Sequence, residues 1–150
     1  MRPLTLFECI TQAAEAESPV WAAALREVPE LDPVFSTLVP EPIAVGFETV
    51  YEAYLVHYGR PRLFEAPDAD EAILLGDYLY AHGLVRIAHA GGVPAVAVLA
   101  ELIATCAAQR ADGTPDDGSA WVAAARALGG DPDADDVERA LASHSARVAA

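Results

Sequence analysis

The sequence predicts a single all-α domain. Alanine is the commonest residue, threonine is scarce, and no long run alternates apolar and polar residues as a half-buried strand would. Over half of the 150 residues (53%) are apolar, which indicates a globular chain with a real core. Proline and glycine divide the chain into segments of helical length, and neither an internal repeat nor a hairpin signal is found.

Residues 1–40 are predicted to hold short helices. Ser18-Pro19 and Asp32-Pro33 each place an N-capping side chain before a proline, which is typical of a helix start. The predicted helices cover residues 4–17, 20–28 and 33–38.

Residues 41–110 are predicted to form the centre of the domain. Pro40 and Pro42 precede a longer helix over 43–58, and a loop leads to a helix capped by Asp68. That helix is apolar nearly all round, Gly91-Gly92 is expected to end it, and an equally apolar helix follows over 93–108. Helices of this kind are buried on several sides or paired with another chain.

The C-terminal helices are predicted within 117–150. A polar linker over 110–119 leads to a short helix at 121–128, and DPDADD (131–136) precedes a last helix. The aspartates of DPDADD resemble the start of a calcium loop, but its sixth and twelfth positions are Asp136 and Ala142 instead of Gly and Glu. We therefore predict acidic capping of a helix.

The charge balance excludes several partners. There are 23 acidic residues against 9 arginines and no lysine, so the net charge is −14. A surface this acidic repels nucleic acid and anionic membranes. It also disfavours any site for a diphosphate, unless Mg²⁺ or a partner chain supplies positive charge.

Other features indicate a cytoplasmic protein without a membrane span. The start lacks the apolar core of a signal peptide, and the apolar stretch 93–108 is short for a span and carries Glu101. Cys9 and Cys106 match no metal spacing and are expected to pack as small hydrophobes. His82 and His89 lack a carboxylate at ligand spacing, so we expect histidines of the core or of an interface.

The most informative stretch is ETVYEAYLVHYGRP, residues 48–61. A helix places Glu48 and Glu52 on one face, one turn apart, beside Tyr51 and Tyr54. Three interpretations are open for this acid pair: a metal site, the degenerate copy of a metal site, or the solvated face of a helix.

Together with the following AILLGDYLYAHGL, this stretch resembles the trans-isoprenyl diphosphate synthases. That all-α family has a helix with DDxxD, an RRGxP-like turn, and then a helix similar to AxLxGDxLxxxA. Aligned without a gap on Gly59 and Pro61 of the turn Gly59-Arg60-Pro61, the first and last acids of DDxxD fall on Glu48 and Glu52, and the middle aspartate falls on Thr49. The arginine pair falls on His57 and Tyr58. Residues 76–79, GDYL, match the second helix, and the resemblance covers roughly residues 40–110.

In the family, the aspartates bind Mg²⁺ that bridges the allylic diphosphate, and arginine and lysine hold the diphosphates. Here Thr49 replaces one aspartate, the arginine pair is missing and no lysine exists. The second aspartate-rich motif belongs to the C-terminal half of the family, and this chain, about half the usual length, ends before it. The resemblance therefore implies a truncated isoprenoid-synthase-like helical bundle without catalytic residues of its own.

The family includes heteromeric enzymes in which a small subunit without the aspartate motifs supports a catalytic large subunit. The resemblance implies that this chain is such a subunit of a medium- or long-chain prenyl diphosphate synthase, in a heterodimer or a larger assembly. It would bind no cofactor itself, the Mg²⁺ would be in the partner, and it would help shape the elongation tunnel. The interface would lie within 72–106 and include Leu75, Gly76, Asp77, Tyr78, Leu79, Ala81, His82, Val85, Leu99, Leu102 and Ile103.

Two alternatives stay open. The first is a helical homodimer that reuses the fold for binding or as a scaffold. The second is an enzyme that acts alone, with Glu48 and Glu52 still holding Mg²⁺, although one carboxylate pair without cationic side chains is a poor diphosphate site.

Overall fold

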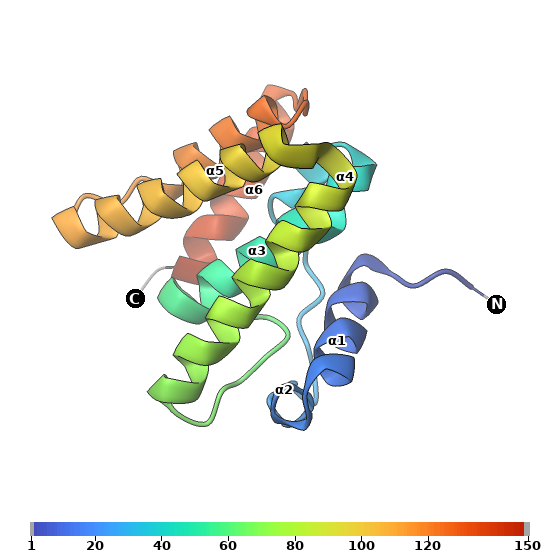
Figure 1. The fold of residues 1–150 in the computed structure, drawn as a ribbon. Coiled ribbons are helices and arrows are strands. Elements are labelled where there is room, and N and C mark those ends of the chain that lie inside the picture. Colours follow the sequence, from blue (N-terminus) through green and yellow to red (C-terminus); the bar gives the residue numbers. More distant parts are fainter. Residues whose placement is uncertain (1, 149–150) are drawn as a thin grey trace.

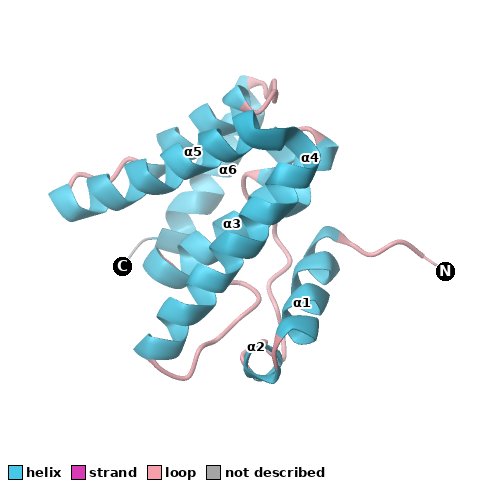
Figure 2. Ribbon diagram, in the orientation of Figure 1, coloured by secondary structure: helices cyan, strands magenta, loops and turns pink. Residues whose placement is uncertain are grey.

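The computed structural model describes residues 2–148, and over this range the chain forms helices and no strand. The predicted all-α class is therefore confirmed (Figures 1 and 2). In chain order the elements are α1 (Leu6–Glu17), α2 (Pro19–Ala23), the 3₁₀ turn η1 (Ser36–Leu38), α3 (Glu41–Tyr58), α4 (Ala69–Asp112), α5 (Asp117–Ala127) and α6 (Ala134–Val148).

Helix α3 is the centre of the molecule. Most of its side chains are buried, because α1, α4 and α6 all pack against it. It joins two apolar clusters. One lies under α4, α5 and α6 around Trp121, and the other lies between α1, α3 and the start of α4 around Leu75 and Leu79. A helix in this position must be largely apolar, and the buried polar exceptions on α3 are Glu48, Thr49 and Glu52.

Helix α4 has two limbs. The break expected at Gly91-Gly92 is present as a kink within one hydrogen-bonded helix, because Gly92 adopts φ 71°, ψ −167° and Pro94 follows inside the next turn. This backbone region is essentially restricted to glycine. Figure 1 shows the limbs (69–91 and 93–112) meeting at a sharp bend, with α5 alongside the second limb.

The N-terminal region differs most from expectation. The second helix ends at Ala23, not at residue 28, because the backbone turns to meet the loop after α3. Leu25 forms an isolated bridge with Phe64, Arg26 N donates to Leu63 O at 2.9 Å, and Glu65 N donates to Ala24 O at 2.7 Å. Long-range pairing thus replaces the helix that local propensity favoured.

The C-terminal helices follow the prediction with shifted boundaries. Helix α5 begins at Asp117, so the expected linker is shorter than predicted. Asp133 Oδ1 accepts a hydrogen bond from Asp136 N at 2.8 Å, which is the capping geometry expected for DPDADD.

Candidate functional site

Both acids of the candidate pair are completely buried. Glu48 and Glu52 lie on the central helix α3 with 0% exposed area. The interpretation of this pair as the solvated face of a helix is therefore wrong. Burying carboxylates is costly unless each is paired with a cation or with several hydrogen-bond donors.

Arg62 supplies that cation. Its Nη1 pairs with Glu48 Oε1, and its Nε donates to Glu52 Oε1 at 3.1 Å. The other oxygen of Glu52 accepts from the backbone N–H groups of Arg62 and Leu63 at 2.9 and 2.8 Å. One guanidinium thus lies against both carboxylates, and the loop after α3 is fixed to the helix through the same contacts.

The surroundings of Arg62 also favour its charged form. The guanidinium carbon lies 5.2 Å from the ring centres of both Phe7 and Tyr51, and Nη1 donates to Asp32 O at 2.8 Å. Burial lowers the pKa of Arg62, but the charges of Glu48 and Glu52 outweigh this and raise it above its ordinary value. The centre is a buried ion triad enclosed by α1 and the 30–36 segment.

This triad does not fit a magnesium ion. Mg²⁺ requires near-octahedral oxygen ligands and keeps several of its waters, whereas these carboxylates are sealed from solvent and bonded to a guanidinium. Thr49, at the place of the middle aspartate, donates to Val45 O at 2.7 Å within its own helix. Over residues 2–148 no three metal-binding side chains gather at one point. We therefore derive no magnesium chemistry from Glu48 and Glu52.

The motif turn Gly59-Arg60-Pro61, which follows α3, is hydrogen-bonded to the end of α6. Arg60 N donates to Arg147 O at 3.0 Å, and Arg60 Nη2 donates to Ala146 O at 2.8 Å. A Cβ on Gly59 would lie only 2.9 Å from Arg147 O, so the close approach needs glycine. The turn borders a cavity of about 510 Å³ that Arg26 also lines.

A second buried polar network lies on the other side of α3. Tyr54 donates its hydroxyl proton to Asp117 Oδ2, and Arg110 bonds to both, with Nε–Oδ2 and Nη2–OH distances of 2.8 Å. Tyr51 OH lies 2.8 Å from His144 Nδ1. Burial raises the pKa of both tyrosines, and it lowers the pKa of His144 to about 4. These groups join four helices, which indicates a structural role.

Several residues expected at a partner interface lie inside the chain. The side chains buried against its own core are Leu75, Leu79, Leu99 and Leu102. Gly76 is buried where α3 and α4 approach closely, and a Cβ there would clash with the His57 side chain. Four of these residues, Leu75, Gly76, Leu79 and Leu99, are covered by this chain itself, whereas Leu102 lines a surface groove between α4 and α5. The expected interface is narrower than the sequence indicated.

The remaining expected contacts reach the surface. Asp77, Ala81 and Val85 are exposed, while Tyr78, His82 and Ile103 are half-buried. The exposed apolar side of α4 continues well beyond them. We call it the α4 face: Leu74, Ala81, Val85 and Ala88 on the first limb, and Val93, Ala97, Ala100 and Ala104 on the second.

The α4 face includes three large apolar side chains that are strongly exposed. Leu74 is 61% exposed, Val85 53% and Val93 81%. By length and composition alone α4 could cross a membrane, yet only 22% of its most apolar 18-residue window is buried inside the protein. Core helices are mostly buried, so much of the apolar surface of α4 is left uncovered by its own chain.

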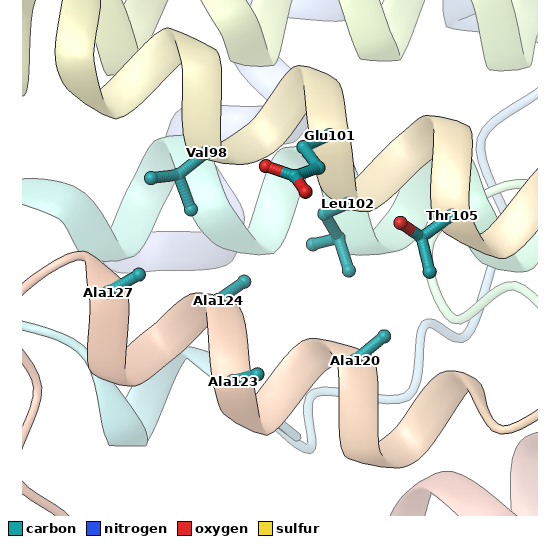
Figure 3. A pocket seen from close by; sticks show the side chains of 8 residues that line it. All are labelled: Val98, Glu101, Leu102, Thr105, Ala120, Ala123, Ala124 and Ala127. Carbon is teal, nitrogen blue, oxygen red and sulfur yellow. The ribbon is translucent and has the colours of Figure 1, made fainter.

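A shallow apolar groove adjoins the second limb. Figure 3 shows Val98, Leu102 and Thr105 of α4 opposite a row of α5 alanines, with Glu101 between Val98 and Leu102. The cavity measures about 290 Å³. Alanines leave this space open where larger side chains would fill it, so the groove can accept an aliphatic side chain from outside.

Sequence reasoning missed Arg62, which organises the acid pair. It lies ten positions after Glu52 in a loop, where no helical or strand periodicity relates it to the acids. The one available signal was the second arginine of GRPR, directly after the turn. No family model, curated protein or solved structure matches this chain.

Proposed function

We propose that this chain is a non-catalytic subunit of a heteromeric trans-prenyl diphosphate synthase. It supports a catalytic large subunit and helps shape the tunnel that receives the growing chain. The assignment to this family rests on the resemblance of Glu48–Pro61 and Gly76–Leu79 to the family's motifs. The fold is consistent with the family in being all-α.

The observation that carries the subunit role is the exposed α4 face. Contiguous exposed apolar surface marks sites of association, and this surface lies on the helix that carries the GDYL motif. A partner that covered it would remove Leu74, Val85 and Val93 from water. Complete burial of such side chains contributes about 1.5 to 3 kcal/mol each, before the cost of association is subtracted.

The ion triad supports the non-catalytic part of the proposal. Arg62 lies where an external cation would have to bind, and the carboxylates are sealed from solvent. Diphosphate chemistry needs open oxygen ligands and exposed cationic groups. In the proposed assembly the large subunit holds Mg²⁺ and both aspartate motifs, and the complex is cytoplasmic.

The test is co-expression with a full-length synthase-like chain from the same genome, followed by an elongation assay. We expect the two chains to copurify, and we expect the large chain to gain stability or product-length control. If the large chain is equally stable, active and length-specific alone, the proposal is wrong. Prenyl transfer by this chain alone would restore the hypothesis of an independent enzyme.

A homodimeric binding or scaffold protein is the second candidate. The same α4 face favours it, because a second copy could also cover that surface. Sedimentation of the purified chain separates the two candidates. A tight homodimer that buries α4 and ignores the synthase-like chain would favour the second.

A further inference from the structure

The charged residues along α4 indicate what kind of partner can cover it. Four charged side chains of α4 are exposed, and all are acidic: Asp70, Asp77, Glu101 and Asp112. On a helical projection Asp70 and Asp77 fall among the apolar residues of the first limb, and Glu101 falls beside those of the second limb. A partner that covers the α4 face must therefore meet these carboxylates.

The arginines of α4 turn toward their own chain. Arg86 Nε bonds to His82 Nε2 at 3.1 Å, and Arg86 Nη2 reaches Cys9 O at 3.4 Å. Arg110 pairs with Asp117 at 2.7 Å in the second buried network. Both arginines are half-buried and bonded within their own chain, so the fully exposed charged side chains of α4 are all acidic.

We propose that the α4 face binds a protein helix with an apolar stripe and flanking arginines or lysines, and that its acids oppose pairing between two copies of this chain. This inference concerns the same surface as the proposed function and rests on it for the existence of a partner. Charges at an interface select partners mainly through the like-charge contacts that they penalise. Two copies would each bring a net charge of −14 and the same acids to the contact.

The groove shown in Figure 3 is where we expect the partner helix to contact the second limb of α4. A leucine or isoleucine of the partner helix enters the cavity of about 290 Å³ between α4 and α5. A basic residue one turn away then meets Glu101, which lines the same cavity. This geometry favours a basic amphipathic helix over an acidic helix with the same apolar stripe.

The test uses two synthetic helical peptides with identical leucine–alanine stripes, flanked by arginine in one and by glutamate in the other. Fluorescence anisotropy measures their binding to the full chain at low and high NaCl. We expect the arginine peptide to bind more tightly, with a Kd that rises with salt, because exposed charge pairs are screened. Hydrogen exchange should show protection of α4.

Variants locate the contact and its charges. Val85→Arg should weaken binding at least tenfold, because it places a charge in the apolar contact, whereas Val28→Arg changes a valine that is 79% exposed outside α4 and should have no effect. Asp77→Asn with Glu101→Gln should reduce the preference for the arginine peptide by roughly 3- to 10-fold. The matched control is Asp135→Asn with Glu138→Gln on α6, which removes equal charge away from the α4 face.

Several outcomes overturn this inference. They are equal binding of the two peptides, binding unaffected by Val85→Arg, a low-salt homodimer with α4 protected, or binding of phosphatidylcholine vesicles that covers α4. The proposed function fails separately, through the elongation assay. A large subunit that depends on this chain while the peptides bind equally would retain the function and reject the charge rule. If the large subunit does not depend on this chain but the arginine peptide binds more tightly, the charge rule stands and the proposed function fails.

Discussion

Replacing Arg62 by methionine tests whether the acid pair depends on its internal cation. The side chain is fully buried, bonds to both Glu48 and Glu52, and donates to Asp32 O. Removing one partner of a buried ion pair costs about 3 to 5 kcal/mol, because a charge is left uncompensated. Here one substitution leaves two carboxylates, four residues apart on α3, without their counter-ion. We therefore expect the loss of stability to fall in the upper part of that range.

The loss is large for a domain of this size, whose total stability is about 5 to 15 kcal/mol. At roughly 2 to 4 °C per kcal/mol, Tm should fall by about 8 to 20 °C. Urea denaturation at neutral pH measures the free energy of unfolding directly. Arg139→Met is the matched control, because Arg139 is exposed and its contact with Asp136 spans 3.5 Å. That variant should change stability by less than about 0.5 kcal/mol.

One further measurement separates charge from packing. Changing Glu48 and Glu52 to glutamine in the same variant should recover most of the stability, because neutral replacement of a buried ion triad is often tolerated. A loss below about 1 kcal/mol, or one that the two glutamine substitutions do not reduce, would refute the assignment of Arg62 as the essential counter-ion.

Three other outcomes follow from the structure. Millimolar MgCl₂ should leave Tm unchanged, since Glu48 and Glu52 are sealed against Arg62; a rise that vanishes in Glu48→Gln would show that metal reaches the pair. Gly92→Ala should lower the free energy of unfolding by roughly 1 to 3 kcal/mol in urea denaturation, because φ 71°, ψ −167° strains any other residue. Gly113→Asn should cost less than about 1 kcal/mol, because Gly113 lies in the left-handed region with open space around it. Burial lowers the pKa of His144 from 6.5 to about 4. As pH falls, His144 therefore takes up a proton in the unfolded chain before it does so in the folded chain. About 3 kcal/mol of folding stability that is present above pH 6.5 is lost as pH falls to about 4. In a pH series of urea melts, His144→Gln should remove this component, and the exposed His89→Gln should retain it.

Local chemistry in the sequence determined most of the helices. Alanine content, the proline and glycine breaks and the capping aspartates placed α3, both limbs of α4 and α6 close to their observed positions. Asp68 caps α4 and Asp133 caps α6 as expected, because a capping side chain needs only residues within one turn. The sequence also showed that α4 has apolar residues around most of its circumference, more than a helix that packs on only one side needs.

The chemistry of the acid pair depends on contacts that exist only in the folded chain. Sequence spacing placed Glu48 and Glu52 on one helical face, but a metal site, a degenerate site and a solvated face share that spacing. The difference lies in Arg62, which reaches both acids from a loop, and in Phe7, which closes the centre from a distant helix. Burial and counter-charge are set by contacts between distant segments, whereas helix periodicity and capping are set within a few residues. For that reason the sequence specified the helix that carries the acids, and the folded chain specified that these acids hold an arginine.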